Sequence, residues 1–290
     1  MAGFSGEFID TRTLDGLELM GLVSGPEDSD TVIIHLHGMQ GNFFQNSFVQ
    51  QMLSDYPGNG LAFMTVEQRG AEAVRIFPRN DEMVKMGNAF ELFEDCLKDI
   101  QAWIDFAVEQ GYENIVLQGH SLATMKIAYY IAEKEHRVDA AVLISPSDMR
   151  GLAVEDIEGH GELMDRARRL EENGKEDEIV VEDLWGWGYL SAKTFINFFG
   201  EDTNTSVFNY LRPEEGFKTV ESIDVPVMAF LGTEDDGIVT DAYESMDLLE
   251  KHVEPRFEGR VLEGAEHDYH GFEEKLVEEI TGFVESVTQE

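Results

Sequence analysis

The chain has 290 residues, and its 59 acidic residues against 21 Lys and Arg give a formal net charge of −38. The length fits one large α/β domain with room for an insertion, and 42% hydrophobic residues are enough for a buried core. We expect no nucleic acid or membrane partner, because the charge repels anionic surfaces and no run approaches the roughly 18 apolar residues of a membrane span.

Strand and helix patterns alternate along the chain after an opening hairpin. The predicted strands span residues 4–10, 17–23, 31–37, 61–66, 115–118, 138–145, 225–231 and 256–262. The predicted helices span residues 42–55, 89–110, 122 to about 136, 240–252 and 272–287. This order predicts an α/β fold with a mostly parallel central sheet, helices on both faces, and functional sites at the carboxyl ends of the strands.

Residues 148–222 interrupt the alternation with Gly-rich, acidic and aromatic stretches. A structureless loop of this length is improbable, so we expect a mostly helical cap inserted over the site, with helices near Gly161–Asn173 and Ser191–Phe199. The predicted domains are a core over 1–147, the cap over 148–222, and the rest of the core over 223–290. Aromatic residues gather in the cap, where they either line an apolar pocket or dock the cap on the core: Trp185, Trp187, Tyr189, Phe195, Phe198 and Phe199.

The segment from Ile115 to Ala123 is an apolar strand, then a tight turn with a serine, then a helix. In such a turn the hydroxyl of Ser121 would stand clear of the backbone. The residues two before and two after the serine must be small, because strand and helix crowd together, and here they are Gly119 and Ala123. The segment therefore predicts a nucleophilic serine.

Two further loops at strand ends carry partners for this serine. Asp235 and Asp236 follow the strand that ends near Gly232, and His267 follows the last strand. The order serine, acid, histidine is that of the α/β-hydrolases. From His37-Gly38 to the last helix, the chain resembles the esterase and lipase branch of that superfamily.

The resemblance implies a role for each residue. His267 would take the proton of Ser121 and return it to the leaving group, and a carboxylate would orient the imidazole. We favour Asp235 as the acid, because the turn after Gly232 directs its side chain across the site. Asp236 remains the alternative, because its spacing to the apolar pair at 238–239 fits the family pattern better.

Two backbone N–H groups are expected to form the oxyanion hole. Leu122 directly follows the predicted nucleophile Ser121. Met39 follows His37-Gly38, the His-Gly pair that the chain shares with the family it resembles. We expect no metal and no cofactor. His35 and His37 share one face of a strand, but no third ligand stands out, and His37 is expected to brace the oxyanion loop.

The main hypothesis is a serine hydrolase that cleaves a carboxylic ester of a small or medium substrate through an acyl-enzyme. A thioester, an amide or a carbon–carbon bond could use the same triad, and a non-catalytic protein that binds a small ligand is a further alternative. We expect a monomer or a small homo-oligomer.

The location of the protein is inferred from three features of the sequence. The N-terminus lacks a basic start and an apolar block, so no secretory signal is expected. A single cysteine, Cys96, cannot form an internal disulfide, which favours a cytoplasmic protein with Cys96 in its core. Because the acidic residues are spread along the chain, we also expect adaptation to a salt-rich cytoplasm, with an ordinary acidic surface as the alternative.

Overall fold

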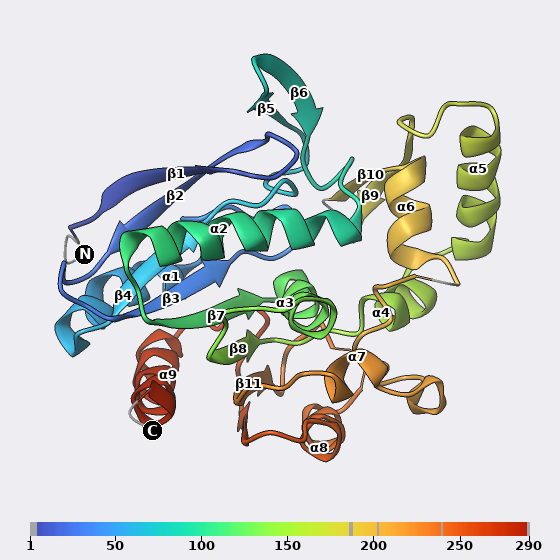
Figure 1. Cartoon of the computed structure of the whole chain (residues 1–290). Coiled ribbons are helices and arrows are strands. Elements are labelled where there is room, and N and C mark those ends of the chain that lie inside the picture. Colours follow the sequence, from blue (N-terminus) through green and yellow to red (C-terminus); the bar gives the residue numbers. More distant parts are fainter. Residues whose placement is uncertain (1–4, 186–187, 202, 239, 289–290) are drawn as a thin grey trace.

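The structure is a computed structural model that describes residues 5–185, 188–201, 203–238 and 240–288. Within these ranges, eight strands form one sheet in the order β1-β2-β4-β3-β7-β8-β11-β12 (Figure 1). The pairs β1-β2 and β2-β4 are antiparallel and all later pairs are parallel, which confirms the predicted fold class. The strands are β1 (Glu7–Arg12), β2 (Glu18–Ser24), β3 (Thr31–Leu36), β4 (Ala62–Val66), β7 (Asn114–His120), β8 (Ala140–Ile144), β11 (Val227–Gly232) and β12 (Phe257–Leu262).

Helices cover both faces of the sheet, because its central strands bury side chains on both sides. Along β3, Val32 and Ile34 pack into one core cluster and Ile33 between them packs into the other. Helices α2, α3 and α8 belong to the first cluster, and α1 and α9 to the second (Figure 1). The bounds are α1 (Ser47–Asp55), α2 (Cys96–Gln110), α3 (Leu122–Glu133), α8 (Ala242–His252) and α9 (Glu273–Thr288), with 3₁₀ turns η1 (Tyr56–Asn59) and η2 (Phe93–Asp95).

A hairpin of β5 (Arg75–Arg79) and β6 (Glu82–Met86) lies where the sequence analysis expects no strand. Its two turn residues, Asn80 and Asp81, have positive φ angles of 47° and 68°. Two consecutive positive φ angles form the turn that matches the twist of a hairpin, and Asn and Asp tolerate this conformation. The Asn-Asp pair between two short apolar-polar runs is the sequence signal for this hairpin.

The segment between β8 and β11 mixes helices with a second hairpin, so the expectation of a mostly helical insertion is incomplete. Helices α5 and α6 lie where they are predicted, but β9 and β10 come between them. The strand signal of Val180 and Val181 is weakened by the acidic pair that follows within β9. The elements are α4 (Met149–Asp156), α5 (His160–Glu172), β9 (Ile179–Leu184), β10 (Gly188–Ser191), α6 (Ala192–Phe199), η3 (Pro213–Glu215) and α7 (Lys218–Glu221). The division into domains at 148–222 stays a prediction.

Helix α6 anchors this segment to the body of the molecule. The ring of Phe198 meets that of Phe93 edge-on, with centroids 6.1 Å apart. The hydroxyl of Thr194 donates to the carbonyl oxygens of Ala89 and Glu91 at 3.0 Å, and the side chain of Asn197 accepts from the N–H of Phe93 at 2.7 Å. These bonds join α6 to the stretch just before α2, so α6 is held by both apolar and polar contacts.

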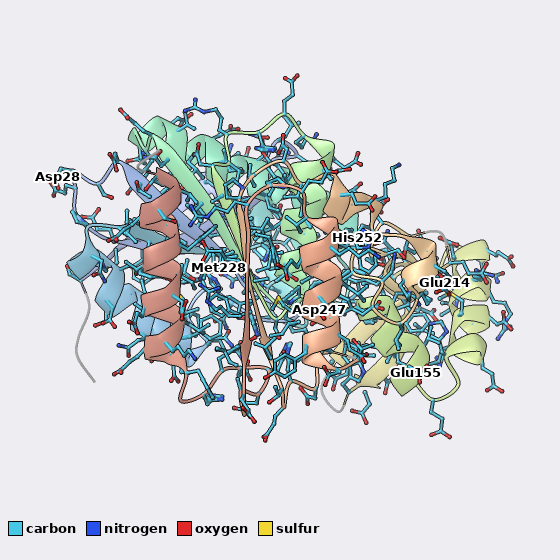
Figure 2. The ribbon with its side chains drawn as sticks, turned by 90° about the horizontal axis from the view of Figure 1, so that it is seen from below. Asp28, Glu155, Glu214, Met228, Asp247 and His252 are labelled. Carbon is cyan, nitrogen blue, oxygen red and sulfur yellow. The ribbon has the colours of Figure 1, made fainter. Side chains whose placement is uncertain are left out.

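Acidic residues lie in separate parts of the structure. Figure 2 shows Glu155, Glu214 and Asp247 on different elements and Asp28 in the turn before β3, while Met228 lies within the sheet. Cys96 is buried, as expected. Among the described helices, none has the length and apolar character needed to cross a membrane.

Candidate active site

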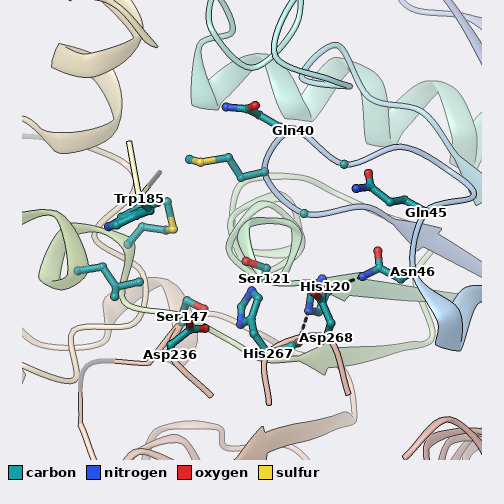
Figure 3. Close-up of a pocket in the computed structure, with 16 residues that line it drawn as sticks. Gln40, Gln45, Asn46, His120, Ser121, Ser147, Trp185, Asp236, His267 and Asp268 are labelled. Carbon is teal, nitrogen blue, oxygen red and sulfur yellow. Dashed lines mark hydrogen bonds between the residues drawn. The ribbon is translucent and has the colours of Figure 1, made fainter. Parts of the chain in front are cut away.

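A cavity of about 640 Å³ lies where the loops after β3, β7, β11 and β12 meet (Figure 3). This is the carboxyl edge of the parallel strands, where the sequence analysis expects a site. The segment between β8 and β11 contributes a further wall. The lining residues are Gly38, Met39, Gln40, Gly41, Gln45, Asn46, His120, Ser121, Ser147, Met149, Leu152, Trp185, Asp236, Gly237, His267 and Asp268.

Ser121 occupies a strained turn between β7 and α3. Its backbone angles are φ 55° and ψ −123°, a conformation that costs a non-glycine residue about 1–3 kcal/mol. A Cβ atom at Gly119 would lie 2.8 Å from Cδ1 of Ile127 and 2.9 Å from the carbonyl carbon of Ala123. Only glycine fits at position 119, so the strand and the helix can approach closely and the Ser121 side chain reaches the cavity.

The structure brings His267 and Asp235 together. The Nδ1–H of His267 donates to Oδ1 of Asp235 at 2.7 Å. The same oxygen accepts the N–H of Gly237 at 2.7 Å, and the hydroxyl of Ser145 donates to Oδ2. Because Nδ1 carries the proton, Nε2 of His267 keeps its lone pair and can act as a base.

The two adjacent acids have different surroundings. The side chain of Asp235 is fully buried, whereas Asp236 is exposed and lines the cavity. A Cβ atom at Gly237 would lie 2.4 Å from Nδ1 of His267, so a glycine there lets the imidazole reach Asp235. Ile238 is partly buried, and Val239 lies outside the described residues.

The charges around His267 raise its pKa. Burial alone would lower the pKa, but the hydrogen bond and the negative charge of Asp235 outweigh this effect, and Asp268 and Asp236 add to it. An imidazole in this setting binds a proton more readily than a free one. Its surroundings therefore stabilise the imidazolium ion that would form when it takes a proton.

The peptide between Gly38 and Met39 is held in a defined plane. The Nδ1–H of His37 donates to the carbonyl oxygen of Gly38 at 2.8 Å, and Nε2 of His37 accepts the N–H of Gln68 at 3.3 Å. Since a peptide is planar and trans, fixing this carbonyl also fixes the Met39 N–H on the opposite side. Met39 lines the cavity, and Leu122 is the first residue of α3, where helical N–H groups have no partner within the helix.

Apolar and polar side chains both line the cavity, and Trp185 lies across it from Asn46 and Asp268 (Figure 3). Met39, Met149, Leu152 and Trp185 contribute apolar groups to it. The polar side chains are Gln40, Gln45, Asn46, Ser147, Asp236 and Asp268, and the amide of Asn46 donates to Asp268 at 2.9 Å.

The aromatic residues of the segment have different positions. Trp185 lines the cavity. The side chains of Phe195, Phe198 and Phe199 are buried in the core cluster, so they dock the segment, and Tyr189 is exposed. Trp187 lies outside the described residues. Both interpretations of the aromatic cluster therefore hold, for different members.

Two groups of residues carry donor atoms of the kind that bind metal ions. Asp235, Asp236 and His267 offer donor atoms within 4.8 Å of one another. The Asp235 and His267 donors already bond to each other, so a metal ion would have to replace that hydrogen bond. His37 uses both ring nitrogens, and His35 lies in the core with Nδ1 2.9 Å from Gln118. Both ring nitrogens of His37 are therefore engaged, whereas Nε2 of His35 has no hydrogen-bond partner among the described residues.

Ser145, which no sequence pattern singled out, contacts both Asp235 and His267. Its Oγ lies 3.3 Å from Nδ1 of His267, and its φ angle is 58°. It directly follows β8, and β8 pairs with β11, whose loop carries Asp235. The sequence does show a hydroxyl directly after a buried strand. Its role can be inferred only once the strand order places β8 beside β11.

The fold is similar to those of solved hydrolases. A siderophore hydrolase from Aspergillus fumigatus matches with a TM-score of 0.70 and 12% identity, covering 100% of this chain and 99% of that one. An alpha/beta hydrolase from a Penicillium species matches with a TM-score of 0.65 and 16% identity, and the match covers 98% of this chain and 99% of that one. These matches confirm the α/β-hydrolase fold that the resemblance predicted.

Two comparisons of sequence agree with the fold. A protein of Mycoplasma pneumoniae that bears the name of an esterase/lipase is 22% identical over 175 residues, which are 59% of this chain. The chain spans 63% of the length of that relative. The family model described as "Protein of unknown function (DUF1749)" matches residues 91–287. Since this match takes in most of the chain, the protein belongs to the DUF1749 family.

Proposed function

We propose that the protein is a serine hydrolase that cleaves a carboxylic ester through an acyl-enzyme. One observation carries the proposal: Ser121 occupies a strained turn at the edge of a cavity that it shares with His267, whose Nδ1 bonds to the buried Asp235. The fold of the two hydrolases and the name of the Mycoplasma relative support it.

Each residue has a step in this reaction. Oγ of Ser121 attacks the carbonyl carbon while Nε2 of His267 takes its proton, and Asp235 stabilises the imidazolium. His267 then gives the proton to the departing alcohol, and a water molecule repeats the sequence to release the acid. Among the described residues, Ser121 Oγ makes no hydrogen bond to His267, and such contacts often tighten only when substrate is bound.

The N–H groups of Met39 and Leu122 are proposed to bind the oxyanion. Negative charge develops on the carbonyl oxygen during attack, and one such donor is worth about 3–4 kcal/mol to the transition state. Leu122 starts α3, whose dipole also favours negative charge at this end. The bond of His37 to the Gly38 carbonyl supports the role of Met39, because it orients the peptide before substrate arrives.

The cavity supports a small or medium ester substrate with an apolar part. Its volume of about 640 Å³ suits a small-molecule ligand. We infer that the side formed by Met149, Leu152 and Trp185 receives the apolar part. The polar side, with Asn46 and Asp268, would then face the other part of the substrate.

Covalent labelling separates a hydrolase from a binding protein. A fluorophosphonate probe should label the folded protein stoichiometrically, and Ser121→Ala should abolish labelling. Ser147→Ala is a matched control, because Ser147 lines the same cavity but does not lie on the elbow. An unreactive Ser121 in folded protein would favour a protein that binds a small ligand without catalysis.

A substrate panel identifies the bond that is cleaved. p-Nitrophenyl esters of graded acyl length should be hydrolysed, and Trp185→Ala should move the preferred length upward because it opens the apolar wall. Matched thioesters and anilides belong in the panel, since the same triad can act on them. If the labelled protein cleaves only a thioester or an amide, the proposed triad stands and the proposed ester substrate is wrong.

A further inference from the structure

His120, the residue before the proposed nucleophile, makes one specific polar contact. Its Nε2 lies 2.8 Å from the main-chain carbonyl oxygen of His267, 147 positions further along the chain. A carbonyl oxygen can only accept, so His120 carries its proton on Nε2 and donates it. The residue is 4% exposed, so little water competes for this bond.

The ring of His120 also lies between three segments. Its centroid is 4.8 Å from that of the His267 ring and 5.3 Å from that of Phe48 on α1. A Cβ atom built on Gly38 would lie 3.5 Å from Nδ1 of His120, so the loop after β3 packs against the same ring. The end of β7 thus contacts both loops that hold the proposed machinery.

Residues on either side of His267 anchor its loop elsewhere: the carbonyl oxygen of Ala265 accepts the N–H of Glu234 at 3.0 Å, and the hydroxyl of the buried Tyr269 donates to the carbonyl oxygen of Phe230 at 3.1 Å. Glu266, Asp268 and His270 are exposed. The His267 side chain is held by Asp235, and the exposed Asp268 by the amide of Asn46. Among the hydrogen bonds of the described residues, the one from His120 holds the backbone of His267 itself to the strand beside the proposed nucleophile.

We propose that His120 is a positioning residue, which holds the backbone of His267 so that its imidazole faces Ser121. His120 itself takes no proton in the reaction. The inference rests on the proposed function, because its effect on rate passes through His267. Burial, with the neighbouring His267 adding, lowers the pKa of His120 to about 4, so the ring is neutral at neutral pH and offers a single N–H.

Two substitutions separate the hydrogen bond from the volume of the ring. His120→Phe keeps a planar ring but lacks the donor, whereas His120→Gln keeps an N–H at a similar reach. A misplaced catalytic group can cost about 100-fold, so we expect His120→Phe to lower kcat about 30- to 100-fold with KM changed less than about threefold. His120→Gln should recover kcat to within about fivefold of the parent.

A pH profile provides a readout that general loosening of the fold would not produce. The groups that face His267 are Asp235, Asp236, Asp268 and His120 itself. When His120→Phe weakens the alignment of His267 with Asp235, the acid limb of kcat/KM should move to lower pH. An unchanged kcat and pH profile in His120→Phe would overturn the proposal. It would also be overturned if His120→Phe and His120→Gln lost kcat equally and had equally lowered melting temperatures.

NMR of the unmodified protein tests the hydrogen bond without any variant. Correlations between ring protons and nitrogens should identify His120 as a neutral imidazole protonated on Nε2 at pH 6. A ring protonated on Nδ1, or a charged one, would overturn the proposal even if the variants do not fold. Failure of the proposed function would give a different result. The unmodified protein would then show neither labelling nor turnover, while the NMR result would be unaffected.

Discussion

Replacing one of two adjacent acids decides which of them serves His267. Asp235→Asn and Asp236→Asn each remove one negative charge from neighbouring positions, so the net charge changes equally. Only Asp235 bonds to the imidazole, at 2.7 Å. We therefore expect a large loss of kcat in Asp235→Asn and a small one in Asp236→Asn.

The size of the loss follows from the contacts of Asp235. An asparagine there can still accept from His267 and Gly237 through its oxygen, while its NH₂ group faces the Ser145 hydroxyl, which can accept. The tautomer of His267 is then preserved, and what is lost is the charge that stabilises the imidazolium. Two unit charges about 4 Å apart at an effective dielectric of about 20 interact by about 4 kcal/mol, which corresponds to about 10³-fold in kcat.

The assay is single-turnover hydrolysis of the best p-nitrophenyl ester, with melting temperatures to confirm that both variants fold. Asp236 is exposed, so its charge is screened and its replacement should change kcat by less than about fivefold. If Asp236→Asn loses as much kcat as Asp235→Asn, the assignment of the acid is wrong. A folded Asp235→Asn variant that keeps kcat within about tenfold would refute the charge argument.

Further outcomes test a buried ion pair, the surface charge and the pH dependence of the site. In the unmodified protein the buried Glu91 carboxylate bonds to Lys126 at 2.9 Å and to the Asn88 amide. Lys126→Met removes the positive partner, so urea denaturation should show that the free energy of unfolding falls by about 3–5 kcal/mol. Adding Glu91→Leu should recover most of this loss, because no unpaired charge then remains. The net charge of −38 predicts that the melting temperature rises as KCl is raised from about 0.1 M to about 2 M, and a flat response would contradict salt adaptation. In the proposed reaction His267 acts as a base only when neutral, and its pKa is raised above the ordinary value of about 6.5, so activity should be lost as pH falls through that raised pKa. Asp236→Asn should move that limb of kcat/KM to lower pH, and an unmoved limb would contradict the part assigned to Asp236.

Local patterns predicted the elements that bury a continuous apolar face. Residues 31–37 are apolar on both faces of a strand, and this pattern is specific enough to predict β3 as a central strand. The hairpin of β9 and β10 lacks such a pattern, because Glu182 and Asp183 interrupt its first strand. Its stability comes from packing against α5 and α6, which a local window does not contain.

The same distinction holds within the candidate site. Crowding at Gly119 is a local property, so the sequence alone predicted the turn at Ser121. The choice between Asp235 and Asp236 is a shift of one residue, and the sequence left it open. In the structure, the close approach of Gly237 to His267 brings the imidazole to Asp235, and Ser145 reaches the same carboxylate only because β8 lies beside β11.

The fold class, the strained serine turn and the order of the three candidate triad residues follow from the amino-acid sequence, because each depends on short-range sterics or on chain order. Three features emerge only from the folded chain: Asp235 as the acid that bonds to the imidazole, Trp185 as an aromatic side chain that lines the cavity, and the bond from His120 to the backbone of His267. Those contacts join residues far apart in the chain, and their geometry depends on how the strands are ordered and how the loops at their ends are packed.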